Sequence, residues 1–193
     1  MDIDLCALVL LVTTVWWYGR ILLPWQETRQ DLVPLNDLVL EVLPRVDLSV
    51  PIALLHWFGM LLFFGLYNEW DPNEVMFAFT VAIWVRSLVL VLHPFDAPRK
   101  CIPLRDPIVE WFIGTQNAPL TRDLSIGGHN LMTVTCGVIL GGRFTHAYYM
   151  LALLEGLMLM ITRAHYTADI ILSMLVAPSA YELSRLVYAY VKL

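Results

Sequence analysis

Two short segments of the chain contain the residues best suited to carry out chemistry. One holds His129, and the other holds His165 and Asp169. On a helix, residues four positions apart lie on one side, so the Asp169 carboxylate can accept the Nδ1–H of His165 and leave its Nε2 free. A nucleophilic histidine needs this orientation. We predict that His165 attacks, that Asp169 holds its ring, and that His129 protonates the leaving group.

The residues around His129 favour an anion as the ligand, and phosphate is the natural candidate. Gly127 and Gly128 allow a close approach of backbone to ligand, and the free N–H groups at the start of a helix there attract negative charge. Planar guanidinium groups match phosphate oxygens, whose charge grows during phosphoryl transfer. The arginines predicted to bind the phosphate are Arg105, Arg122 and Arg163.

The composition of the whole chain indicates a membrane protein. Of its 193 residues, 59% are hydrophobic and 15% are charged, against about 45–50% apolar and 25% charged in soluble domains. The formal net charge of −5 excludes the basic surface that binding to nucleic acid requires. The three cysteines are widely spaced, which indicates neither a disulfide framework nor a cysteine-based zinc site.

Six apolar runs are long enough to cross a bilayer, which takes about 20 mostly apolar residues in a helix. They cover residues 5–23, 48–68, 74–92, 124–142, 145–162 and 168–191. Two long connections, residues 24–47 and 93–123, are rich in Pro, Asp and Arg, and the other loops are short. We therefore predict an all-α fold in which residues 1–193 form one domain, a polytopic bundle of six transmembrane helices.

Loop parity places both chemical segments on the same face of the membrane. The connections after the first, third and fifth spans share this face, and the termini share the opposite face with the other two loops. Most Lys and Arg residues also lie on the first face, which by the positive-inside rule indicates the cytoplasm. Arginines that bind an anion would inflate that count.

The same segments resemble the active-site motifs of the type 2 phosphatidic acid phosphatase superfamily, in particular its sphingomyelin synthase-like branch. The similar motifs are Pro34-Leu35-Asn36-Asp37 followed by Leu43-Pro44, Ile102 to Pro107, Arg122-Asp123-Leu124, the pair Gly128-His129, and His165 to Asp169. The active-site motifs fall within residues 86–169, and the resemblance covers most of the chain. It implies six spans and a triad of His129, His165 and Asp169 that works without a metal or another cofactor.

The resemblance also implies an activity. Family members transfer a phospho-head-group from a phospholipid to a lipid alcohol of the diacylglycerol or ceramide type, or they hydrolyse a lipid phosphate, and their active sites generally face the exoplasmic or lumenal side. The family usually has Ser-Gly-His-Thr where this chain has Gly127-Gly128-His129-Asn130. Ser125, two residues earlier, partly replaces the missing hydroxyl as a phosphate ligand.

Other interpretations of the same residues remain open. The triad residues could ligate zinc, although the nearby arginines would repel a cation. Loss of the family's serine at Gly127 suggests a lipid-binding protein without turnover. Arg86 and Glu155, each inside an apolar run, could line a transport path or form a structural ion pair, and Arg86 could instead reach the phosphate pocket. We interpret three further histidines, His56, His93 and His146, as packing or interface residues.

Overall fold

The computed structural model describes the chain except for residues 1–2, 31, 68–70, 114–119 and 192–193. The described residues form helices and no strand. In chain order the helical elements are α1 (Leu5–Trp17), the π-helical turn η1 (Tyr18–Leu22), α2 (Leu23–Thr28), α3 (Leu38–Val42), α4 (Ser49–Leu66), α5 (Pro72–Leu92), α6 (Pro107–Ile113), α7 (Gly128–Leu140), α8 (Gly142–Ile161) and α9 (Thr167–Val191).

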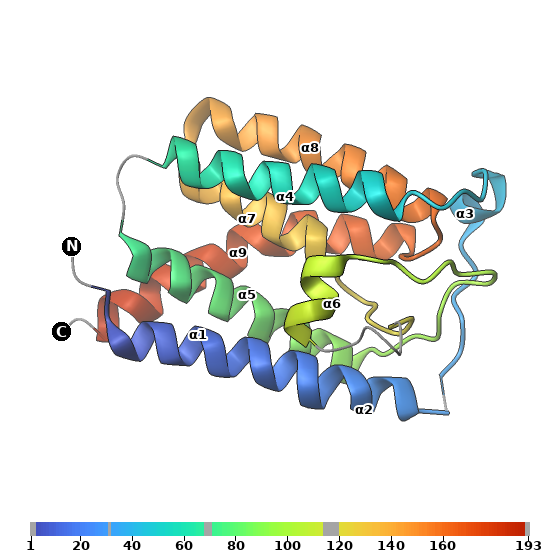
Figure 1. The fold of residues 1–193 in the computed structure, drawn as a ribbon, viewed down its shortest axis with the longest axis horizontal. Coiled ribbons are helices and arrows are strands. Elements are labelled where there is room, and N and C mark those ends of the chain that lie inside the picture. The colour runs from blue at the N-terminus through green and yellow to red at the C-terminus, as the bar shows by residue number, and fades with distance from the viewer. Residues whose placement is uncertain (1–2, 31, 68–70, 114–119, 192–193) are drawn as a thin grey trace.

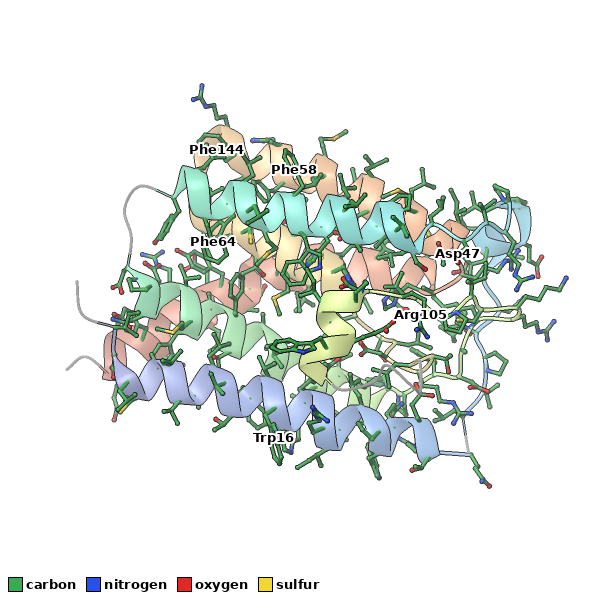
Figure 2. The ribbon with its side chains drawn as sticks, viewed as in Figure 1. Trp16, Asp47, Phe58, Phe64, Arg105 and Phe144 are labelled. Carbon is green, nitrogen blue, oxygen red and sulfur yellow. The ribbon has the colours of Figure 1, made fainter. Side chains whose placement is uncertain are left out.

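Within the part of the chain that the structure describes, five helices are long and apolar enough to cross a membrane. They are the continuous helix Leu5–Thr28, which joins α1, η1 and α2, together with α4, α5, α8 and the stretch Thr167–Tyr190 of α9. Their apolar side chains point outward as well as inward, as Trp16 on α1 and Phe58 on α4 illustrate (Figure 2). These features confirm the predicted all-α membrane bundle.

The fourth predicted span, residues 124–142, is shorter than the sequence suggested. Helix α7 begins only at Gly128 and has 13 residues, or about 20 Å at 1.5 Å per residue, against about 30 Å of hydrocarbon. The preceding residues from Leu124 to Gly127 are buried but not helical, and Ser125 has a φ of 84°. Helix α7 packs against α4, α5, α8 and α9, so it is the central helix of the bundle.

Carboxylate side chains fix where several helices begin. Asp4, Asp37 and Asp71 cap α1, α3 and α5 by accepting backbone N–H groups of the first turn. Asp106 does the same for α6, through the N–H groups of Ile108 and Val109. Such caps satisfy N–H groups that have no partner within the helix.

The helices lie side by side, with α7 and α9 between the α4–α8 pair and the α1–α5 pair (Figure 1). The chain around α3, the segment that follows α5 and the turn between α8 and α9 gather at one end of the bundle, the end that holds α2 and α3, whereas α6 lies nearer the middle (Figure 1). The start of α1 and the end of α9 lie at the opposite end (Figure 1). This arrangement agrees with the loop parity predicted from the sequence, and it brings the two chemical segments to the same end.

Candidate active site

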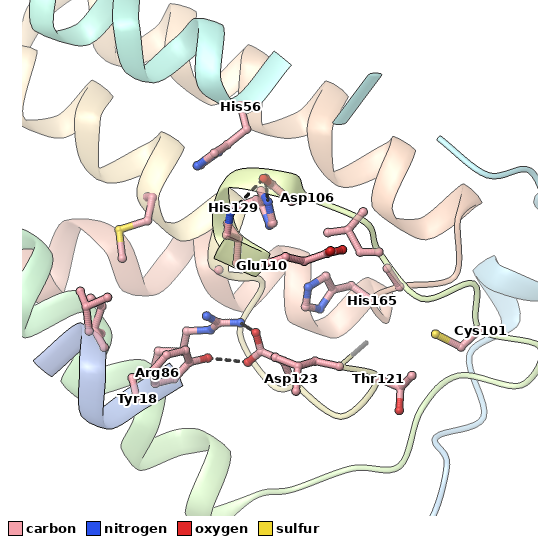
Figure 3. Close-up of a pocket in the computed structure, with 18 residues that line it drawn as sticks. Tyr18, His56, Arg86, Cys101, Asp106, Glu110, Thr121, Asp123, His129 and His165 are labelled. Atoms are coloured by element: carbon pink, nitrogen blue, oxygen red, sulfur yellow. Dashed lines mark hydrogen bonds and ion pairs between the residues drawn. The ribbon is translucent and has the colours of Figure 1, made fainter. Parts of the chain in front are cut away.

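A pocket of about 210 Å³ lies at the loop end of the bundle, beside the start of α7 (Figure 3). Both predicted histidines, His129 and His165, line it. Its other ionisable lining residues include His56, Arg86, Asp106, Glu110 and Asp123. The pocket therefore joins residues from α4, α5, α7, the second long connection and the α8–α9 turn.

His165 and Asp169 form the hydrogen bond that their spacing predicted. Nδ1 of His165 lies 3.1 Å from Oδ2 of Asp169. The same carboxylate accepts the backbone N–H groups of Tyr166, at 3.0 Å, and Ser125, at 3.1 Å. Since a carboxylate only accepts hydrogen bonds, Nδ1 of the neutral ring carries the proton and Nε2 carries the lone pair. His165 thus has the form of a nucleophile with its free nitrogen available to the pocket.

His129 makes its carboxylate contact through the other ring nitrogen. Its Nε2 lies 3.3 Å from Oδ2 of Asp106. Asp106 is held in turn by the indole N–H of Trp57 at 3.0 Å and by its cap of α6. Burial alone raises the pKa of Asp106, but hydrogen bonds from His129, the Val109 N–H and Trp57 lower it to about 2. Asp106 is therefore a carboxylate at neutral pH and stabilises the protonated ring that a general acid needs.

Arg86, from within α5, is the arginine that lines the pocket. Its Nη2 lies 2.7 Å from Oδ2 of Asp123, and its Nε donates to the carbonyl of Ile126 at 2.8 Å. The guanidinium also lies over the ring of Tyr18, with Cζ 5.2 Å from the ring centroid, and the Tyr18 hydroxyl donates to Asp123. Tyr18 belongs to the π-helical turn, a type of distortion that is frequent at functional sites.

The sequence left three roles open for Arg86: lining a transport path, pairing with Glu155 and reaching the pocket. The ion pair between Arg86 and Glu155 is wrong, because Arg86 pairs with Asp123 while Glu155 contacts His56. The alternative that Arg86 reaches the pocket is confirmed. The Arg86 side chain is only 8% exposed, so its positive charge lies inside the bundle beside Asp123.

The three arginines predicted to bind phosphate do not line this pocket. Arg105 is exposed, and its Nε lies 3.0 Å from Oε1 of Glu110 at the pocket edge. Arg122 turns away, since its Nε contacts Asp96 at 2.9 Å and its Nη1 donates to the carbonyls of Glu27 and Arg29. Arg163 lines a second hollow beside Asp37 and Tyr166. Proximity in sequence to the triad therefore does not bring these three arginines into the pocket.

Ser125, Gly127 and Gly128, at and just before the start of α7, shape the site through their own contacts. Ser125 donates through its hydroxyl to the carbonyl of His93 at 2.6 Å, and its N–H contacts Asp169, so its side chain is not directed at a ligand. Gly127 is buried, and its N–H donates to the carbonyl of Asp169 at 3.3 Å. Gly128 lines the pocket beneath Arg86.

Sequence reasoning missed the roles of Asp106, Tyr18 and His56. Asp106 falls inside the quoted motif Ile102 to Pro107, but nothing in its spacing linked it to His129. Tyr18 and His56 lie in apolar runs far from either segment, so only tertiary packing reveals them. The other two histidines interpreted as packing or interface residues, His93 and His146, are exposed and lie outside the pocket.

The chain matches no protein-family model and no curated protein. Within the described residues, no group of three or more His, Cys, Asp or Glu side chains has the spacing to hold a metal ion.

Proposed function

We propose that the chain is an integral membrane phosphotransferase that moves a phospho-head-group from a phospholipid to a lipid alcohol through a phosphohistidine. The observation that supports this most directly is the His165–Asp169 pair, whose free Nε2 shares one pocket with His129 and Arg86. Phosphoryl transfer needs a proton donor and a positive charge beside the nucleophile, and His129 and Arg86 line the same pocket as His165. The pocket also includes residues of the second long connection and of the α8–α9 turn, at the end of the bundle where we expect the phosphate of a membrane lipid.

In the first half-reaction, the lone pair on Nε2 of His165 forms a bond to phosphorus. The bond from phosphorus to the diacylglycerol oxygen breaks, and that oxygen takes a proton from His129. Asp169 stabilises the positive charge that develops on the His165 ring. In the second half-reaction, an acceptor hydroxyl gives its proton to an unprotonated histidine of the pocket and attacks phosphorus, and the bond from phosphorus to Nε2 of His165 breaks.

Arg86 takes the place of the three arginines predicted from the sequence. Its positive charge is held by Asp123 and Tyr18 against the start of α7, where Gly128 leaves room for it. A guanidinium in a site of low dielectric stabilises the charge that accumulates on phosphate oxygens in the transition state. We assign Arg86, together with the backbone of Gly128, as the phosphate-binding part of the site.

The acceptor defines the kind of enzyme. A lipid hydroxyl of the diacylglycerol or ceramide type makes the protein a head-group transferase, and water makes it a lipid phosphatase. In line with the family resemblance, we propose that the site faces the exoplasmic or lumenal side. Protease access to tags at the two termini in sealed vesicles tests this orientation.

Purified protein in liposomes provides the test of the reaction. The liposomes contain phosphatidylcholine labelled in its head-group, with a ceramide or a diacylglycerol of distinct acyl chains as acceptor. We expect labelled exchanged lipid with wild-type protein and none with His165→Ala. Free phosphate or phosphocholine as the main product would favour the phosphatase. Lipid binding without any product would instead favour a non-catalytic lipid-binding protein.

A further inference from the structure

A second pair of a histidine and a carboxylate faces the same pocket. His56, on α4, lines the pocket, and its Nδ1 lies 3.0 Å from Oε1 of Glu155 on α8. Thr133, on α7, donates its hydroxyl to Oε2 of Glu155 at 2.9 Å and lies 3.3 Å from Nδ1 of His56. The three side chains are buried at the meeting point of three helices.

These contacts determine which nitrogen of His56 is free. Glu155 accepts hydrogen bonds from the His56 ring and from the Thr133 hydroxyl, which uses its only hydrogen in this bond. The proton of the neutral His56 ring therefore lies on Nδ1, and the lone pair lies on Nε2. His165 has the same arrangement, with Nδ1 on a buried carboxylate and Nε2 free.

A packing role alone does not account for Glu155. Its side chain is 1% exposed, and a carboxylate inside an apolar bundle is costly, so such residues usually have a function. His56 would be satisfied at lower cost by a neutral partner such as a backbone carbonyl. A carboxylate on Nδ1 instead fixes the tautomer and the orientation of the ring, with Nε2 as the free nitrogen.

The position of His56 relative to His129 indicates which proton it handles. The two rings meet edge to face, with centroids 4.6 Å apart. His129, whose Nε2 faces the Asp106 carboxylate, is assigned as the group that gives a proton, whereas His56 has a lone pair on Nε2 before the reaction begins. The pocket thus holds one acid and one base next to each other (Figure 3).

We propose that His56, held by Glu155, is the general base for an acceptor hydroxyl other than the donor's own diacylglycerol. This inference rests on the phosphotransferase function proposed above. The acceptor oxygen forms a bond to phosphorus, the bond from phosphorus to Nε2 of His165 breaks, and the acceptor proton passes to Nε2 of His56. That proton then returns to His129, which lost one to the leaving diacylglycerol. Glu155 is a positioning residue in this scheme.

Microscopic reversibility makes the proposal testable. Exchange of diacylglycerol into phosphatidylcholine is the first half-reaction run forward and then backward, so it needs His129 and not His56. Transfer to ceramide or water needs His56 as well. The two reactions can be followed in the same liposomes, with head-group-labelled phosphatidylcholine, a diacylglycerol of distinct acyl chains, and ceramide.

The test compares wild-type protein with His56→Gln, Glu155→Gln and His146→Gln. A glutamine at position 56 can still hydrogen-bond to Glu155 but cannot take a proton. We expect His56→Gln to lower transfer to ceramide or water by about 100-fold or more and to leave diacylglycerol exchange near the wild-type rate. Glu155→Gln should reduce the same transfer. His146 is exposed on α8, away from the pocket, so His146→Gln should change neither reaction.

Each outcome is informative. Labelled ceramide product identifies a lipid acceptor, and labelled phosphocholine identifies water. Unchanged transfer in His56→Gln would overturn the proposal, and so would an equal fall of exchange and transfer, which would mean a structural role. Exchange restricted to diacylglycerol in wild-type protein would also overturn it. If wild-type protein shows neither exchange nor transfer, the phosphotransferase function itself fails.

Discussion

The guanidinium of Arg86 occupies the space where a side chain at Gly128 would lie. A Cβ added to Gly128 would be 2.7 Å from Cζ of Arg86, closer than carbon atoms in contact approach. Arg86 is held there by Asp123, Ile126 and Tyr18, so it cannot move aside freely. Because Gly128 has no side chain, it leaves the space that the Arg86 guanidinium occupies in the pocket.

We predict that Gly128→Ala displaces Arg86 and lowers activity at least tenfold. Overpacking of this kind costs about 1–3 kcal/mol of stability, which thermal unfolding in detergent would measure. Gly127→Ala is the matched control, because a Cβ there meets Ile170 Cδ1 at 3.4 Å, an ordinary contact. Equal activity in the two variants would contradict the role assigned to Gly128.

Gly127→Ser should be tolerated. Gly127 has φ −62° and ψ 114°, which any residue adopts, and it is the N-cap of α7. Serine at an N-cap stabilises a helix by a few tenths of a kcal/mol relative to glycine. We expect unfolding temperature and activity equal to or slightly above those of wild-type protein, with Gly127→Ala as the variant that lacks the hydroxyl. A large loss of activity in Gly127→Ser alone would show that the pocket excludes this hydroxyl.

Local patterns predicted part of the fold and of the site, and tertiary packing decided the rest. The His165–Asp169 contact was predicted from helical spacing, but His165 precedes α9, so the contact forms across the start of that helix. The length of the apolar runs predicted the spans. The choice among arginines was not predictable. Arg122 contacts Asp96 within its own long connection and donates to carbonyls of the other one, whereas Arg86 enters from a span. The late start of α7 likewise follows from Ser125, whose positive φ interrupts a continuous apolar run.

Loss of one partner of the Arg86–Asp123 ion pair should lower the stability of the protein more than loss of both partners. Arg86→Gln leaves Asp123 without its partner, which we expect to cost about 2 kcal/mol because Asp123 retains some exposure. Arg86→Gln combined with Asp123→Asn removes both charges and should recover most of that stability. Activity should stay at least 100-fold below wild type in both variants, because the phosphate-binding charge is gone. Recovery of activity in the double variant would exclude Arg86 as the phosphate ligand.

The Asp106 carboxylate should make the free energy of unfolding depend on pH. Its pKa is lowered from 3.8 to about 2 in the folded protein, so its contribution is fully present above the unfolded pKa and is lost as the pH falls from about 4 towards 2. The shift corresponds to about 2 kcal/mol. Asp106→Asn should therefore be less stable than wild type at pH 6, and the difference should shrink as the pH is lowered below 4. Chemical unfolding in detergent at several pH values measures this, and a constant difference would contradict it.

The paired roles of the two predicted histidines also constrain the pH profile of the reaction. His165 attacks only when its Nε2 is unprotonated, and His129 gives a proton only when its ring is protonated, so the active fraction falls on both sides of an optimum. We expect a bell-shaped dependence of the transfer rate between about pH 5 and pH 9. Loss of the Asp106 carboxylate removes the group that favours protonated His129, so in Asp106→Asn the alkaline limb should move to lower pH. A flat profile in wild-type protein would contradict both assignments, and an unmoved alkaline limb in Asp106→Asn would contradict the assignment of His129 as the acid.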